Sequence, residues 1–192
     1  MKKGRLEAFS DGVLAIIITI MVLEMKAPHG ADFASLKPLI PVFSSYVLSF
    51  LYVGIYWNNH HHLLQSTEKV SASILWANLH FLFWLSLVPL VTGWMGENNF
   101  EAAPVALYGI ILLMAAIAYW ILQTQILKKH GTNSELAKAL GKDFKGKISP
   151  VLYIVAIACS FVNPWISGII YALVALMWVI PDKRLERIFE DN

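Results

Sequence analysis

One carboxylate lies inside the first apolar stretch of the chain. Asp11 follows Arg5, Phe9 and Ser10, and a long apolar run then continues to Leu23. An ionised side chain is costly inside a bilayer, so a residue of this kind is expected to face protein or water and to mark a functional site. Asp11 is therefore predicted to fix the first helix in place.

A second pattern on the same stretch consists of Ile16, Thr19, Ile20 and Leu23, which are three or four residues apart and share one face of a helix. This face has no charge and a single hydroxyl layer. Such a face is more often a packing surface than the wall of a pathway. However, no other span has a hydrophilic stripe, so a pathway here would be narrow and hydrophobic, and would gate by dewetting.

Polar residues of the next two apolar stretches are predicted to lie at the depth of Asp11. They are Asn58, His60, His61, Asn78 and His80, together with Ser10 from the first helix. Buried polar groups need partners, so we expect a structural network that clamps the first helix to the second and third. A proton relay or pH sensor is the alternative, because histidine titrates near neutrality.

Two familiar ion-binding patterns do not fit. Adjacent residues on a helix point about 100° apart, so the triplet His60-His61-His62 cannot converge on one zinc ion. The run Tyr52 to Tyr56, with Gly54 at its centre, resembles a carbonyl selectivity filter, but its carbonyls are predicted to bond within a helix. We expect no metal site, no cofactor and, without a nucleophile–base pair, no enzyme.

The elements that position these residues are predicted from composition. The chain of 192 residues is 57% hydrophobic and 15% charged, against about 25% charged in soluble domains. Its apolar residues come in blocks long enough to cross a bilayer, which takes about 20 residues per helix. The single cysteine, Cys159, excludes a disulfide framework, and the net charge of +2 does not suggest nucleic acid. An all-α integral membrane protein is predicted.

The chain is predicted to form one transmembrane domain, residues 1–192, with both termini in the cytoplasm and the cell (plasma or inner) membrane as its location. This topology places thirteen of the fifteen basic residues inside. Glu7 and Asp11 argue against a cleaved signal peptide. Six spans are expected, at about 5–23, 38–57, 71–93, 104–127, 148–161 and 165–180.

Several of these motifs resemble the signature of the transmembrane protein 175 family, the lysosomal potassium channels and their bacterial relatives. The pattern Arg5-x-x-x-Phe9-Ser10-Asp11 at the start of a first span is the most specific of them. Supporting positions are Ala15, Ile16, Thr19, Trp57-x-x-His60-His61, Asn78 and Pro89. One six-helix repeat is similar to the bacterial branch, since the animal members carry two.

The resemblance implies a potassium-permeable cation channel, a homotetramer whose first helices line the pore. By position, Ile16 would be the main constriction, Thr19 the hydroxyl layer linked to selectivity and Leu23 a further narrow layer, with Ile20 less secure. A modest preference for potassium over sodium is implied. Structural and gating roles would fall to Arg5, Phe9, Ser10 and Asp11, tied to Trp57, His60, His61 and Asn78.

Two further expectations concern Glu24 and an alternative to the channel. Glu24 follows the apolar face and, in a symmetric ring, would attract cations to the outer mouth. The alternative to a channel is a proton-coupled secondary transporter that uses Asp11, His60, His61 and His80 as a relay. No inverted repeat or matched pair of broken helices supports the transporter.

Overall fold

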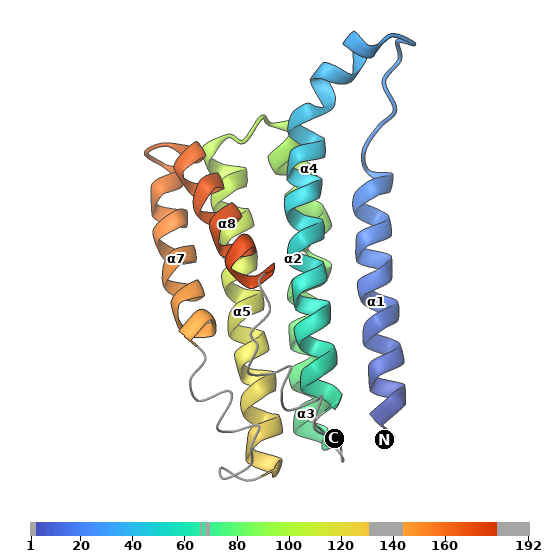
Figure 1. Ribbon diagram of the computed structural model, residues 1–192, viewed down its shortest axis with the longest axis vertical. Helices are drawn as coiled ribbons and strands as arrows, with labels where there is room; N and C mark the ends of the chain where they lie inside the picture. The colour runs from blue at the N-terminus through green and yellow to red at the C-terminus, as the bar shows by residue number, and fades with distance from the viewer. Residues whose placement is uncertain (1–2, 66, 68–69, 131–143, 180–192) are drawn as a thin grey trace.

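The computed structural model describes residues 3–65, 67, 70–130 and 144–179, which form helices joined by short connections (Figure 1). No strand occurs in this part of the chain. The elements are α1 (Lys3–Leu23), the 3-10 helix η1 (Phe33–Leu39), α2 (Ile40–Gln65), α3 (Ala72–Ser86), α4 (Val88–Glu97), α5 (Ala102–His130), α7 (Phe144–Ser160) and α8 (Pro164–Val179). The all-α fold class is therefore confirmed.

Four helical segments are long and apolar enough to cross a membrane: α1, η1 with α2, α3 with α4, and α5. The remaining two, α7 and α8, have 17 and 16 residues, somewhat fewer than the roughly 20 of a typical span. They form a hairpin in which the side chain of Asn163 accepts a hydrogen bond from the backbone N–H of Trp165 at 3.0 Å. Residues 131–143, between the fourth and fifth predicted spans, and residues 180–192 lie outside the described residues.

The third predicted span, 71–93, is two helices rather than one. Ser71 caps the start of α3, and the helix ends at Ser86, two residues before Val88 opens α4. Pro89 has no backbone N–H to donate to the preceding turn, so a continuous helix would lack one hydrogen bond there. Pro89 instead occupies the first turn of α4, where the missing donor has no cost.

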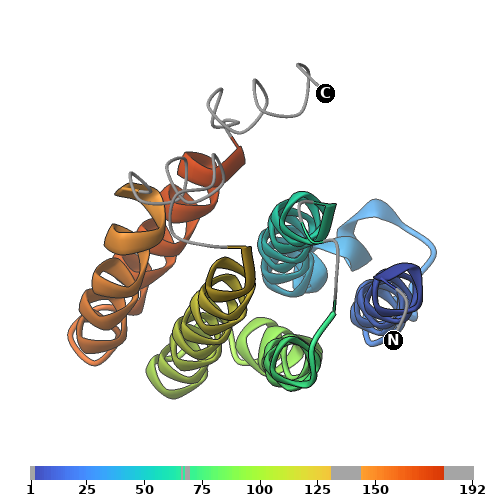
Figure 2. The same ribbon diagram turned by 90° about the horizontal axis from the view of Figure 1, so that it is seen from below.

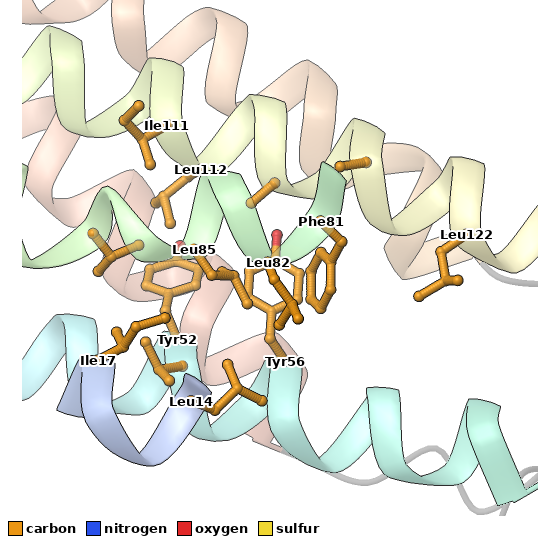
Figure 3. Close-up of a cluster of buried hydrophobic side chains, with 14 of the residues drawn as sticks. Leu14, Ile17, Tyr52, Tyr56, Phe81, Leu82, Leu85, Ile111, Leu112 and Leu122 are labelled. Atoms are coloured by element: carbon orange, nitrogen blue, oxygen red, sulfur yellow. The ribbon is translucent and has the colours of Figure 1, made fainter. Parts of the chain in front are cut away.

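The helices lie side by side, with α1 at one edge and the α7–α8 hairpin at the other (Figures 1 and 2). The beginning of α1 and the ends of α2 and α5 share one end of the bundle (Figure 1). Helix α5 packs against α3, α4, α7 and α8, whereas α1 packs against α2, α3 and α4. The core combines aliphatic residues with the aromatic rings of Tyr52, Tyr56 and Phe81 (Figure 3).

Candidate pore helix and its anchors

Helix α1 has one buried face. Leu6, Ser10, Leu14, Ile17 and Met21 are almost completely buried, and they recur three or four residues apart, as one side of a helix requires. This side packs on α2, α3 and α4. The other sides of α1 are less buried, because no described residue covers them to the same extent.

The predicted pathway residues lie on the exposed side. Ile16 is 60% exposed and Leu23 is 75% exposed, while Ile20, at 41%, lies nearer the packed edge. Thr19 is also exposed, and its hydroxyl donates to the carbonyl of Ala15 at 2.8 Å. Because that bond uses the only hydroxyl proton, the outward side of the Thr19 oxygen offers lone pairs, which suit a cation.

A buried hydrogen-bond chain joins three helices at the inner part of α1. Asn78 on α3 donates through Nδ2 to the Oγ of Ser10 at 3.0 Å, and Ser10 donates to the Leu6 carbonyl at 2.9 Å. The Oδ1 of Asn78 faces the Nε2 of His60 at 2.6 Å. Since Oδ1 can only accept, Nε2 carries the proton in this arrangement. The His60 ring also stacks on Phe81, with centroids 5.7 Å apart.

A second anchor lies nearer the surface. The indole N–H of Trp57 donates to the carboxylate of Asp11 at 3.0 Å, and the Trp57 ring stacks on His61 with centroids 6.2 Å apart. A side-chain hydrogen bond of 2.9 Å joins His61 to Gln65, and Lys3 donates to the Gln65 carbonyl at 2.8 Å. Asp11 is therefore paired with α2, but through tryptophan rather than directly through a histidine.

The polar residues predicted to form one network instead form two separate anchors, one around Ser10, Asn78 and His60 and one around Asp11 and Trp57. His80 takes part in neither anchor, so its predicted place in the network was wrong. The Nε2 of His80 accepts from the indole of Trp84 at 2.9 Å, one turn along the same helix. A step of two residues along a helix rotates the side-chain direction by about 200°. His80 therefore points away from the side of α3 that faces α1, where Asn78 lies. Asn58 is exposed.

Two residues of the most specific motif lie on the exposed side of α1. Phe9 is exposed, and so is Arg5, which makes no hydrogen bond or ion pair with any described residue. Both follow the line of Ile16 along the helix, on the side of α1 that the described residues leave exposed. The motif is therefore divided, with Ser10 and Asp11 bonded inside the subunit and the other two facing out.

Sequence reasoning missed a third anchor at the opposite end of α1. The hydroxyls of Ser49 and Thr92 are 2.6 Å apart, and Ser49 donates to the hydroxyl of Tyr108 at 3.1 Å. The Thr92 hydroxyl donates to the Val88 carbonyl in its own helix at 2.7 Å, and it lies 4.0 Å from the sulfur of Met21. No sequence signal marks these residues, because isolated hydroxyls in apolar spans usually bond their own helix.

Glu24 lies beside α4. Its carboxylate is 3.0 Å from the position that a Cβ atom on Gly93 would occupy. Glu24 lines a crevice of about 310 Å³ together with Lys26 and Glu97, which form an ion pair at 3.8 Å. Among the described residues, no group of three histidine, cysteine, aspartate or glutamate side chains could hold a metal ion.

The chain is similar to several known proteins. The family model described as the endosomal/lysosomal potassium channel TMEM175 matches residues 5–89. A potassium channel of Chryseobacterium sp. (strain P1-3) is 59% identical over 192 residues, covering 100% of both chains. A potassium channel of Chamaesiphon minutus is 30% identical over 190 residues, covering 88% of this chain and 90% of the relative.

A solved structure matches the fold as well. It is the crystal structure of a lysosomal potassium-selective channel TMEM175 homolog from Chamaesiphon minutus, with a TM-score of 0.80 and 29% sequence identity. The match covers 93% of this chain and 96% of that one. The resemblance predicted from the Arg5 to Asp11 motif is thereby confirmed, and this chain belongs to the TMEM175 family.

Proposed function

We propose that this chain is a potassium-permeable cation channel of the cell membrane, assembled as a homotetramer in which α1 of every subunit lines the pore. Relatives that match the chain over most of its length are named potassium channels. They are channels rather than enzymes, and they favour the channel over the proton-coupled transporter. The permeant ion of the proposal is potassium, and no cofactor is required.

The exposed apolar face of α1 carries the proposal. One apolar helix cannot enclose a pathway, but identical helices arranged around a closed symmetry axis can. Gly4, Ala8 and Gly12 lie one turn apart along one edge of this face and are exposed. Small residues at this spacing let neighbouring helices approach closely in a membrane. The line of Ile16 and Leu23 would then point toward the axis.

Each pore residue has a physical role in this arrangement. A ring of Ile16 side chains would exclude water at the narrowest point and act as a hydrophobic gate. A ring of Thr19 oxygens, one layer further out, would offer partial coordination to a dehydrating cation. A modest preference for potassium over sodium is expected, because hydroxyl oxygens on side chains hold a less rigid geometry than backbone carbonyls.

The buried contacts would keep this face directed at the axis. Hydrogen bonds of Ser10, Asn78 and His60 would fix the rotation of α1 at one end, and the buried side chain of Met21 packs beside Thr92 at the other. The proposed topology places both termini in the cytoplasm. It is supported by Lys3, Lys128 and Lys129 at one end of the bundle, the end at which α1 begins and α5 finishes (Figure 1).

The test is ion flux in liposomes that contain the purified protein. Ile16→Asn places a polar side chain at the proposed constriction, so potassium flux should rise about tenfold, equivalent to ~1.4 kcal/mol off the barrier. Sodium flux should rise more than potassium flux, because a hydrated constriction discriminates less.

A matched control is Ile169→Asn on α8, since Ile169 is 58% exposed and the α7–α8 hairpin lies at the opposite edge of the bundle from α1 (Figure 1). This variant should leave the flux unchanged. Equal effects of the two substitutions would show that the response reflects a general perturbation of the membrane protein. Flux that requires an imposed proton gradient in both proteins would instead favour the Asp11–histidine transporter.

A further inference from the structure

A cavity of about 300 Å³ is lined by residues of α2, α5, α7 and α8. In Figure 2, α5, α7 and α8 lie on the other side of α2 from α1. This volume is at the lower end of the roughly 300–1,000 Å³ of ligand pockets. Its walls are mostly aromatic and aliphatic, and include Tyr52, Ile55, Ala116, Tyr153 and Trp178. Neither the pore face of α1 nor its anchors contribute to it.

The polarity of the lining changes along the bundle. Ala116, Tyr52 and Tyr153 line its deep end, while Gln123 and Lys147 lie toward the end of the bundle where α5 finishes. Gln123 is seven residues beyond Ala116, which corresponds to about 10 Å along a helix. Lys147, three residues into α7, is exposed and is the only charged residue among the described residues of the lining.

Gln123 is the feature that points to a ligand. Its side chain is only 8% exposed, yet its amide forms no hydrogen bond with any described residue. The oxygen and nitrogen of this amide are not closed off from the cavity, so they are available to a molecule bound there. Two other polar groups of the lining bond within the protein: Trp178 donates to Ser149 at 2.9 Å, and Asn59 donates to the Ile55 carbonyl at 2.8 Å.

We propose that this cavity binds one acyl chain of an anionic phospholipid from the adjacent membrane leaflet. Its phosphate would be attracted by Lys147, and the amide of Gln123 would donate to an ester carbonyl. The acyl chain would lie against Tyr52, Ala116 and Tyr153. This order of charge, hydrogen-bond donor and apolar wall follows the order of phosphate, ester and hydrocarbon in the lipid.

The rim of the cavity supports entry from the bilayer. Trp120 lines the cavity and is 64% exposed on the outward side of α5. Tryptophan favours the membrane interface, where its apolar ring meets lipid and its N–H meets water. A water-soluble ligand would have no advantage at such a rim. The proposal does not depend on channel activity, because the cavity lies within one subunit and apart from α1.

The experiment uses the full chain in phosphatidylcholine vesicles that contain a phosphatidylglycerol with a photoreactive diazirine in one acyl chain. After illumination, mass spectrometry identifies the labelled peptides. Labels are expected on the α5 segment from Ala116 to Gln123 and on Tyr153. Gln123→Leu, which keeps the size of the side chain, should lower labelling about two- to tenfold, the range that one hydrogen bond supplies.

Two matched pairs of variants complete the experiment. Ala116→Phe fills the deep end and should lower the labelling of Tyr153, whereas Ala158→Phe on the exposed side of α7 should not. Lys147→Gln should remove the preference for phosphatidylglycerol over an equally labelled phosphatidylcholine, while Lys129→Gln should retain it. Lys147 is exposed, so its variant is informative even if Ala116→Phe fails to fold.

Three outcomes would overturn the proposal. One is labelling confined to outward-facing residues such as Leu176, with no change in the variants. Another is equal labelling of the cavity by the two lipids, which would remove the role of Lys147. The third is unchanged labelling in Gln123→Leu, which would show that the Gln123 amide bonds to water and not to the lipid. Loss of ion flux in any of these variants has no bearing on the result, because labelling is measured directly.

Discussion

Helices α1 and α5 are both long and apolar enough to cross a membrane, but they occupy different environments. Half of the residues in the most apolar window of α5 are buried within the subunit, against 28% in that of α1. Helix α5 is enclosed by four other helices, whereas α1 packs through one face (Figure 2). The difference teaches that an apolar helix can leave most of its surface without contacts inside its own chain.

The first half of α2 resembles α1 in this respect. Only 22% of the most apolar window of the η1–α2 segment is buried. Ile40, Phe43, Val47 and Phe50 are exposed and recur three or four residues apart, so they form one continuous face. An apolar face that the described residues leave uncovered is therefore present on the first half of α2 as well as on α1.

The largest expected effect on stability comes from replacing a buried glycine of α5, and a glycine of α1 serves as the comparison. A Cβ atom at Gly109 on α5 would overlap the hydroxyl of Tyr171, which donates to the Val105 carbonyl at 3.2 Å, and would approach Ile157. Gly109→Ala should therefore lower the free energy of unfolding by about 1–3 kcal/mol. Thermal unfolding in detergent, followed by tryptophan fluorescence, measures the change.

Gly12 on α1 is the matched position, because a Cβ atom there meets nothing within 4 Å in the subunit. Gly12→Ala should leave the subunit as stable or up to about 1 kcal/mol more stable, since alanine favours helix over glycine. Gly12→Leu should in contrast weaken the tetramer, which cross-linking in membranes would detect. A Gly12→Leu protein that still cross-links as a tetramer would remove α1 from the subunit interface.

The next effect tests the anchor that orients α1. Asn78→Leu leaves the Nε2 of His60 buried without its partner and releases Ser10 from α3. The free energy of unfolding should fall by about 1–2 kcal/mol, the upper range for polar contacts between membrane helices. The same unfolding assay applies.

Asn98→Leu provides the comparison, because Asn98 is exposed and its amide donates to the Trp94 carbonyl in its own turn at 2.8 Å. Asn98→Leu should lower the free energy of unfolding by much less than Asn78→Leu does. If the two losses are equal, the hydrogen bonds of Asn78 contribute nothing beyond a local turn, and another contact must orient α1.

The smallest effect concerns the outer mouth. Glu24→Gln should lower potassium conductance roughly twofold at 0.01 M salt, where the Debye length is about 30 Å, and leave it unchanged at 1 M. The effect is modest because the Glu24 carboxylate lies against Gly93 on α4. Single-channel recording at the two salt concentrations measures it. Glu101→Gln, at an exposed position just before α5, should have less effect, and equal effects would show only a general surface charge.

Much of the candidate site could be predicted before the structure. The spacing of Ile16, Thr19 and Leu23 placed these residues on one face, and the structure exposes that face. The pairing of Ser10 and Asn78 followed from the need of buried polar groups for partners. The role of His80 was predicted wrongly, because depth in the membrane was used without the direction in which the side chain points.

The sequence by itself determined that the chain is helical and membrane-spanning, because long apolar blocks in a bilayer must satisfy their backbone hydrogen bonds internally. It also determined which residues share a face, because the period of a helix is set by its geometry. Only the tertiary structure decided which face of α1 is packed and which hydroxyls meet Thr92. It also decided where the cavity around Gln123 opens. Apolar helices of similar hydropathy are equivalent to the lipid, so shape and hydrogen bonding choose their neighbours.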